Sequence, residues 1–421
     1  MEPAPRRRPV QKSAEHDNVQ LTRRAGLAGF AASAAGTLLP RRLAGREAEI
    51  VVGAPNALSG VFADLGTRGL WGMQLAVARI NSGGGVKALG GARIALVSAD
   101  TTSDDPARAA DVTRRMIEQD RPVALLGAGA STMTLAVQAE AERAEIPLIT
   151  SASADGIVNR GYRHTFKMAP QGGALWNWTA SNAYALWREA KGRTPRSALI
   201  VMGDDAVGQV VLKHLPEHAR SLGLALAPPL AFRTGRADVQ AAVAAARRHR
   251  PDLIFLGGFP SDTVPLIKAL RAAGVPAPVF GAGLLGTDAV GKGLGSAADK
   301  LFTPMAWTWD LAAFGNKELV AAYKEAHPDQ PYPPANEQLG QGYVAAMILR
   351  QALETAASRD ARKIRAVLAT QEFAGLPYPN PTVRFGEKGL NVNNTAVLAE
   401  WIKGELRTVW PRSQQTVPPM L

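Results

Sequence analysis

The sequence predicts an α/β protein with two doubly wound parallel-sheet lobes, and three observations support this fold class. From Glu49 onward, short apolar runs alternate with segments whose apolar residues recur at helical spacing, as in parallel β–α–β units. The alternation pauses around 163–172 and then resumes, so it forms two successive blocks. The length of 421 residues also exceeds what one core needs and predicts two or three domains.

In the first block, each strand ends in turn residues before a helix begins. The helical segments are amphipathic, as expected for helices that cover a sheet. The predicted strands are 50–55, 92–100, 123–128 and 147–150, and the predicted helices are 69–81, 107–120 and 132–144.

The second block repeats this pattern, and a different region closes the chain. The predicted strands are 197–203, 224–232, 252–258 and 278–281, and the predicted helices are 205–222, 237–248 and 261–273. A long helical region at 316–370 and short strands near 382–410 follow. Residues 412–421 have no periodic pattern and form a tail.

The first 47 residues are typical of an export signal. Arg23 and Arg24 precede the small and apolar run 25–39, which is shorter than the ~20 residues that span a bilayer. The paired arginines resemble a twin-arginine signal, so we expect export by that route and a periplasmic location.

Composition excludes several functional classes. The chain has no cysteine, which removes disulfides, thiolate metal sites and cysteine nucleophiles. The net charge is +12, but eight basic and three acidic residues lie within the first 44 positions. The remaining charge is spread along helices without interleaved aromatic residues, so we expect no nucleic-acid partner.

Polar, turn-rich segments follow several of the predicted strands. They include Ser59-Gly60, Ser131-Thr132, 151–153 and 257–259. Ligands of open α/β sheets bind outside the carboxyl ends of the strands. Two blocks that face each other across these loops would form a ligand cleft.

Ordered segments covering residues 49–410 resemble the type I periplasmic solute-binding proteins, in particular the branched-chain amino-acid (leucine/isoleucine/valine) binding branch. They include PNALSGVFADLG (55–66), ARINSGGGV (78–86), LLGAGAST (125–132), IPLITSASA (146–154), GYRHTFKMAP (161–170), LIFLGGFPSD (253–262) and VRFGEKG (383–389). The resemblance implies two lobes joined by three crossover strands, 48–170 with 304–383 and 171–303 with 384–411. It also implies a non-enzymatic monomer that delivers a small solute to an ABC transporter permease, with no cofactor or metal.

The resemblance carries ligand-binding positions onto this chain one at a time. It places a carboxylate-binding serine at Ser131, beside Thr132 at a predicted helix start where backbone N–H groups are free. Capping of that helix is the alternative role for Ser131. The other implied positions are the loop residues Ala152, Ser153 and Ala154, the aromatic Phe259, and Leu65 and Val207 where the family often has aromatic residues.

The positions where the resemblance places acidic residues for the ligand's ammonium group are not acidic in this chain. The family holds the ligand's ammonium with acidic residues, which here fall at Gln171-Gly172 and at Gly283. An unpaired buried ammonium costs several kcal/mol. We therefore expect a carboxylate ligand with an aromatic or apolar body. The alternatives are an amino-acid ligand held by Asp155, Asp204, Asp262 or Asp288, and a ligand-sensing receptor component of the same fold.

Aromatic residues beside the predicted cleft are consistent with such a ligand. Trp176, Trp178, Trp307 and Trp309 lie near the first two crossovers. They would either form walls of the site or pack the hinge and its helices.

Two further motifs match patterns of other functions. Gly281, Gly283 and Gly286 have the G-x-G-x-x-G spacing of dinucleotide-binding turns, but they end the second block rather than open a sheet. We interpret them as a glycine-rich loop that approaches the cleft. The segment HLPEH at 214–218 matches H-x-x-E-H, but Pro216 is expected to disturb its helix, which argues against a zinc site.

Overall fold

A parallel five-stranded sheet organises the first block of the structure, a computed structural model that describes residues 49–281 and 283–421. The strand order is β2-β1-β3-β4-β5, and every pairing is parallel. The strands are β1 (Ile50–Asn56), β2 (Ile94–Asp100), β3 (Leu125–Leu126), β4 (Leu148–Thr150) and β5 (Thr165–Lys167). The predicted parallel architecture is confirmed for this block.

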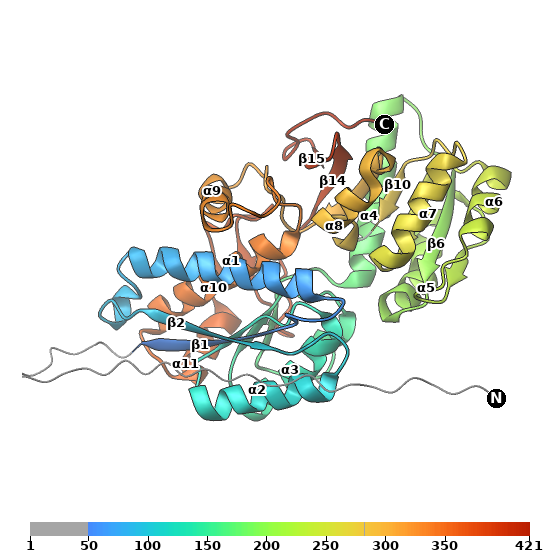
Figure 1. The fold of residues 1–421 in the computed structure, drawn as a ribbon. Helices are drawn as coiled ribbons and strands as arrows, with labels where there is room; N and C mark the ends of the chain where they lie inside the picture. Colours follow the sequence, from blue (N-terminus) through green and yellow to red (C-terminus); the bar gives the residue numbers. More distant parts are fainter. Residues whose placement is uncertain (1–48, 282) are drawn as a thin grey trace, which may run out of the picture. The chain divides into compact units, whose positions relative to one another are not determined.

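The helices of this block follow the strands in the predicted alternation (Figure 1). Asp105 caps α2 by accepting a hydrogen bond from the backbone N–H of Arg108 at 3.0 Å, and Pro106 occupies the first helical position. The helices are α1 (Ala63–Ser82), α2 (Pro106–Asp120) and α3 (Ser131–Arg143), with short 3₁₀ turns η1 (Lys87–Leu89) and η2 (Asp155–Val158).

The second sheet is mixed. Its order is β15-β14-β11-β10-β9-β6-β7, with β8 also paired to β6, and only the pairings of β14 are antiparallel. The strands are β6 (Ser197–Gly203), β7 (Ala225–Leu226), β8 (Leu230–Phe232), β9 (Leu253–Gly257), β10 (Val279–Gly281), β11 (Leu301–Met305), β14 (Val397–Ile402) and β15 (Glu405–Trp410). Its helices and 3₁₀ turns are α4 (Gly172–Lys191), α5 (Ala206–Ser221), α6 (Val239–His249), α7 (Pro260–Ala272), η3 (Gly283–Leu285), α8 (Asp288–Leu294) and η4 (Gly295–Ala298).

The predicted helical region at 316–370 consists of three helices, α9 (Asn316–Ala326), α10 (Glu337–Ala356) and α11 (Ala361–Thr370). Helix α10 lies against α1, as Figure 1 shows. A Cβ at Gly72 would lie 2.0 Å from the carbonyl oxygen of Leu339, and one at Gly342 would lie 2.0 Å from that of Gly69. Glycines therefore permit the close approach of the two helices. A two-stranded ladder follows, β12 (Glu372–Phe373) with β13 (Val383–Arg384).

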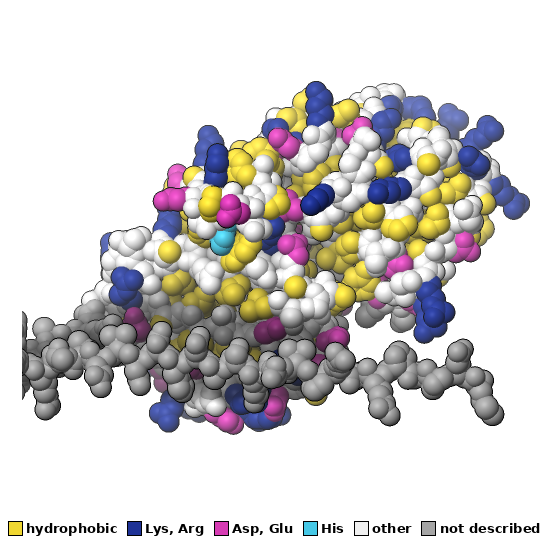
Figure 2. All heavy atoms as spheres, in the orientation of Figure 1, with side chains coloured by type: hydrophobic (Ala, Val, Ile, Leu, Met, Phe, Trp, Pro, Cys, Tyr) yellow, Lys and Arg dark blue, Asp and Glu magenta, His cyan; other side chains and the backbone are white. Residues whose placement is uncertain are grey.

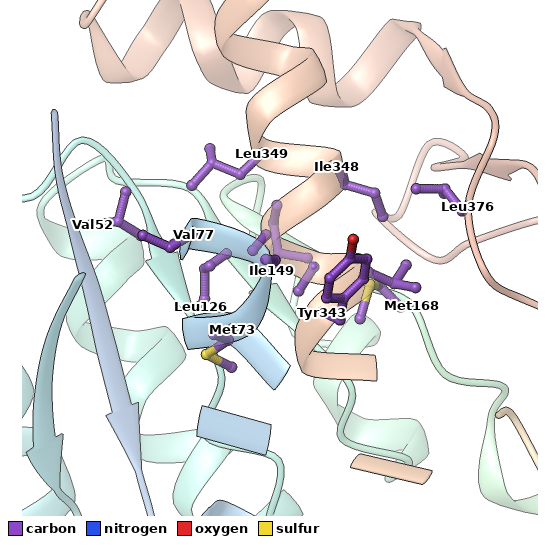
Figure 3. Packing of buried hydrophobic residues seen from close by; sticks show 14 of the residues in the cluster. Val52, Met73, Val77, Leu126, Ile149, Met168, Tyr343, Ile348, Leu349 and Leu376 are labelled. Carbon is purple, nitrogen blue, oxygen red and sulfur yellow. The ribbon is translucent and has the colours of Figure 1, made fainter. Parts of the chain in front are cut away.

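Side chains from distant segments fill the core of the first block. In Figure 3, Val52 of β1 and Val77 of α1 belong to the same cluster as Tyr343 and Leu349 of α10. These residues are buried, with exposed fractions of 0% for Val52, 9% for Val77, 3% for Tyr343 and 1% for Leu349. The C-terminal helices therefore complete a core that the first sheet begins.

The chain passes three times between the two sheets within the described residues. It leaves the first sheet after β5, returns after β11, and enters the second sheet again between β13 and β14. At the second crossing, Met305 packs in the core of the second sheet, whereas Ala306 and Trp307 pack in that of the first. This connectivity is the one predicted for a hinge of three crossover segments.

Two local features differ from the sequence prediction, and the C-terminal tail is held by hydrogen bonds. Helix α5 runs through Pro216, so the expected disturbance does not end it. The predicted strand 224–232 is split into β7 and β8, because Pro228 and Pro229 lack the N–H that a ladder requires. The tail is bonded to both blocks: Thr416 N–H donates to the carbonyl of Thr408, and the Gln414 side chain donates to that of Pro379.

Basic side chains on the face in Figure 2 form separate groups with acidic groups between them. This agrees with a charge excess that is spread along helices. Among residues 49–281 and 283–421, no helix has the length and apolarity needed to cross a membrane. The predicted export signal at 1–47 lies outside the described residues.

Candidate ligand-binding site

The loop that leads into α3 has an unusual backbone. Gly127, Ala128 and Gly129 all have positive φ, at 124°, 59° and 51°. For alanine this left-handed conformation costs about 1–2 kcal/mol. A Cβ at Gly129 would lie 2.9 Å from Leu65 Cδ2, so the loop packs directly on Leu65. Such stored strain is characteristic of functional loops.

Ser131 occupies the first position of α3, and its side chain does not cap the helix. Its Oγ accepts a hydrogen bond from the backbone N–H of Ala154 at 3.1 Å. A serine hydroxyl can accept such a bond and still donate its own proton. Ser131 therefore orders the neighbouring loop and keeps a donor available beside the first N–H groups of the helix, where negative charge is favoured.

The loop after β4 is held by three different elements. The Ser151 hydroxyl donates to Gln338 Oε1 of α10 at 2.6 Å, and Ser131 holds Ala154 from α3. The backbone N–H of Gly172 in α4 donates to the carbonyl of Ser153 at 3.1 Å. Ala152 is buried within the loop, with 1% of its surface exposed. The predicted loop residues are thus placed together with Ser131.

The first turns of α4 and α5 face this loop from the second block. Gln171 precedes α4, and its side chain makes no capping bond. A Cβ at Gly172 would lie 3.7 Å from Val207 Cγ1 and 3.8 Å from the carbonyl oxygen of Ser153. Gly172 therefore lies against the loop after β4, and Val207 of α5 lies beside Gly172.

Phe259 lies opposite an aromatic residue that the sequence reasoning missed. Its ring is 5.8 Å from the ring of Phe62, centroid to centroid. Phe62 directly precedes α1 and stands three residues before Leu65. An aromatic residue in the first β–α loop, one helical turn from a predicted site residue, was the available signal.

Two predicted residues remain apart from this group. Thr132 follows Ser131 directly, but its side chain is exposed on α3. Gly283 begins η3 directly after the undescribed residue 282. A Cβ at Gly286 would lie 2.4 Å from Met305 Sδ, and one at Gly281 would lie 2.0 Å from Leu285 Cδ1. These two glycines thus serve the packing of the turn.

Lys167, at the end of β5, is fully buried near the same loop. Its Nζ donates to the carbonyls of Ala169 at 3.0 Å and Pro170 at 2.8 Å. Burial lowers the pKa of this lysine to about 7, and attraction to Asp155 opposes that shift. The first crossover therefore begins with a desolvated cation and a nearby carboxylate.

The four acidic alternatives for an ammonium site have different surroundings. Asp204 accepts from the N–H of Thr234 at 2.9 Å, and Asp262 from those of Gly235 at 2.8 Å and Ala237 at 3.2 Å. Asp288 lies 3.2 Å from Arg68, and burial raises its pKa to about 6. Asp155 retains a buried oxygen, Oδ1, without a hydrogen-bond partner among the described residues. Asp155 directly follows Ala154 at the end of the loop after β4 and begins η2.

The tryptophans at the second crossover pack the protein interior. Trp307 is fully buried, and its Nε1 donates to Asn316 Oδ1 at 2.7 Å. Trp309 Nε1 donates to the carbonyl of Leu406 at 2.7 Å. Trp176 is 2% exposed and belongs to a core of the second sheet. Packing of the hinge and its helices, the second role considered for them, accounts for these three side chains.

Comparison with known proteins places this site in a family. The family model described as periplasmic binding protein matches residues 49–405, which include the first sheet and every strand of the second sheet up to β14. The chain belongs to the periplasmic binding protein family. The predicted resemblance is thereby confirmed.

Relatives within the periplasmic binding protein family cover most of the chain. The Leu/Ile/Val-binding protein homolog 8 of Brucella abortus (strain 2308) is 26% identical over 377 residues, covering 87% of this chain and 91% of the relative. The substrate-binding protein LivJ of Streptococcus pneumoniae, solved with isoleucine, has a TM-score of 0.74 at 21% identity. The match covers 88% of this chain and 100% of the LivJ chain. An R. palustris solute-binding protein solved with benzoate has a TM-score of 0.71 at 21% identity. The match covers 89% of this chain and 98% of that protein. These structures share the fold of this chain.

Proposed function

We propose that this protein captures a small organic carboxylate between the loops of its two sheets and delivers it to an ABC transporter. The observation that carries the proposal is the hydrogen bond from Ala154 N–H to Ser131 Oγ. It fixes the serine hydroxyl at the start of α3 and leaves its proton to donate to an anion.

The walls of the proposed site favour a ligand with an apolar body. Phe62 and Phe259 approach each other from the two blocks, Leu65 packs on the loop that leads into α3, and Val207 lies beside Gly172 at the start of α4. Apolar walls with a few fixed polar groups are typical of small-molecule sites. Related proteins have been solved with benzoate and with isoleucine, which are both carboxylates.

In the proposed cycle, two lobes close on the ligand by rotation at the three crossovers, without chemical conversion of the ligand. We assign 48–170 with 304–383 to one lobe and 171–303 with 384–411 to the other. The proposed partner is the membrane permease of an ABC transporter. The N-terminal segment would direct the protein, as a monomer, to the periplasm through the twin-arginine route.

A thermal-shift screen with aromatic acids, short-chain acids and amino acids tests the proposal. A ligand at 100 times its Kd stabilises the folded state by about 2.7 kcal/mol, so a true ligand raises the melting temperature clearly. We expect at least one carboxylate to do so and the Ser131→Ala variant to respond less. No stabilisation by any acid or amino acid of the screen would contradict the proposal.

A further inference from the structure

We infer that one side of the second block binds the anionic surface of a lipid bilayer. We call this side the outer edge. It comprises the last helical turns and the loops that lead into the strands of the second sheet, with the loop between β14 and β15. Its segments are 188–196, 218–224, 246–252, 269–278, 295–300 and 403–404. The inference goes beyond ligand capture and does not depend on which ligand is bound.

The topology of the second sheet brings these segments together, although they are far apart in the sequence. The pairings among β6, β7, β8, β9, β10 and β11 are all parallel, so the helices between these strands end on the same side of the block. Strand β14 runs antiparallel to β11, so the loop after β14 lies on that side too. Charges that are spread along the sequence are therefore collected on one surface.

Contacts between neighbouring loops show that the outer edge is continuous. Arg193 Nη2 lies 3.1 Å from Asp252 Oδ1, which joins the loop before β6 to the loop before β9. Helix α6 packs beside α7. Arg271 Nη2 at the end of α7 donates to the carbonyl of Asp299 at 3.0 Å, which joins this helix to the loop before β11.

The outer edge is strongly basic. Its segments contain eleven lysines and arginines and three acidic residues. Two of these acids, Asp252 and Glu189, already form ion pairs, with Arg193 and with Arg412 of the tail. Several of the basic groups in Figure 2 lie over the region of the second block where Figure 1 shows α6. The surface therefore has a large excess of positive charge.

Three exposed arginines from different loops of the outer edge have free side chains. The side chains of Arg196, Arg220 and Arg248 form no ion pair and no hydrogen bond with the rest of residues 49–281 and 283–421. A guanidinium can donate two parallel hydrogen bonds to a phosphate group. These side chains are therefore available to the phosphates of a lipid surface.

The corresponding side of the first block does not have this excess. Its last helical turns and following loops, 79–93, 117–124, 140–147 and 159–164, contain seven lysines and arginines and five acidic residues. The helix dipole favours basic residues at helix C-termini, but it acts equally in both blocks. The dipole therefore does not account for the charge of the outer edge.

The chemistry of the outer edge fits a lipid surface better than a nucleic acid. Its segments contain no phenylalanine, tyrosine or tryptophan on which bases could stack. A hollow of about 410 Å³ on the same side is lined by Lys268, Arg271 and Lys300, with Asp299 also on its wall. This hollow has the size of a small-molecule site and would take an anionic headgroup. Clusters of basic side chains bind anionic lipids in this way.

Co-sedimentation of the full chain with lipid vesicles tests the inference. The probes are vesicles of phosphatidylcholine alone and vesicles of phosphatidylcholine mixed with phosphatidylglycerol. We expect the protein to bind the mixed vesicles more strongly and to be released as the salt concentration rises, because salt screens exposed charges. The triple variant Arg196→Gln/Arg220→Gln/Arg248→Gln should bind the mixed vesicles at least about tenfold more weakly.

A matched triple variant separates the outer edge from net charge. Lys87→Gln/Arg93→Gln/Arg108→Gln removes the same charge from exposed positions of the first block and should bind nearly as well as the wild type. All the proteins carry the same N-terminal segment, so a difference between the two triple variants reports the outer edge. All six side chains are exposed, and equal melting temperatures verify that both variants are folded.

Three results would overturn the inference. The first is equal binding of both kinds of vesicle by the wild type. The second is an equal loss of binding in the two triple variants, which would assign the binding to net charge alone. The third is tighter binding of an acidic polypeptide, poly-glutamate, than of the mixed vesicles, which would assign the outer edge to an acidic protein partner. None of these results bears on the proposed capture of a carboxylate.

Discussion

Phe62 and Phe259 lie with their ring centroids 5.8 Å apart and their planes inclined by 48°. Each residue directly precedes a helix, Phe62 before α1 of the first block and Phe259 before α7 of the second. The contact therefore connects helix starts that belong to different sheets. It marks the apolar side of the proposed site.

Replacing either aromatic residue by alanine should weaken binding of an apolar carboxylate. Burial of an apolar side chain contributes about 1.5–3 kcal/mol, so we expect Phe259→Ala and Phe62→Ala each to cost a substantial part of that in binding free energy. Isothermal titration calorimetry measures the loss. Phe314→Ala removes an exposed aromatic residue elsewhere and should bind normally. If Phe62→Ala and Phe259→Ala both bind with wild-type affinity, these two aromatic side chains do not contact the ligand.

Ser131→Ala should reduce affinity for a carboxylate ligand by about 1–3 kcal/mol, the range for loss of a hydrogen bond to a charged group. The substitution also removes the acceptor of the Ala154 N–H, so the loop after β4 should become less ordered. Titration of the variant gives the affinity, and Ser221→Ala, on an exposed part of α5, is the control. An unchanged Kd would limit Ser131 to a structural role.

Close packing at the second crossover makes Gly340 sensitive to substitution. A Cβ at this position would lie 2.0 Å from Trp307 Cγ, and Trp307 is fully buried. Overpacking of this kind typically costs 1–3 kcal/mol. We expect Gly340→Ala to lower the urea midpoint by a corresponding amount, and Gly156→Ala, where a Cβ meets no atom within 4 Å, to change it little. A urea midpoint of Gly340→Ala equal to that of the wild type would contradict the described packing.

The buried carboxylate of Glu400 should make the free energy of unfolding depend on pH. Burial raises its pKa from 4.5 to about 7, although the N–H of Met420 donates to it at 2.9 Å. The folded state then binds more protons than the unfolded state between these two pH values, so stability falls as the pH rises through this window. Glu400→Gln has no such penalty and should gain stability relative to the wild type between about pH 5 and about pH 8.

Urea unfolding at both pH values measures this gain. Glu217→Gln replaces an exposed carboxylate and should follow the wild type at both. A Glu400→Gln difference that does not change with pH would show that Glu400 does not titrate in this window.

The alternation of strands and helices could be predicted from sequence because it depends on local hydrophobic periodicity. Predicted helices such as 205–222 and 261–273 match α5 (Ala206–Ser221) and α7 (Pro260–Ala272) within a residue. Proline was harder to judge: Pro216 lies within α5, whereas Pro228 and Pro229 interrupt a predicted strand. In a strand, proline removes a ladder bond that no neighbour replaces.

The neighbourhood of the site was less accessible to sequence reasoning, because it depends on contacts between distant segments. The sequence indicated Ser131 through the start of its helix, but not that its hydroxyl accepts from Ala154. It considered Asp155 only as one of four acids, because nothing local shows that this carboxylate faces Gly172 and Gly173. Phe62 was missed because its partner, Phe259, lies in the other block.

The central claim is that the ligand's carboxylate is held at Ser131 and the start of α3. Calorimetric titration of the wild type with the most stabilising acid of the screen and with its primary amide, which has the same body but no charge, tests it most directly. The account predicts that the acid binds at least about tenfold more tightly than the amide, and that Ser131→Ala narrows this difference. Equal affinity of acid and amide in the wild type would contradict it.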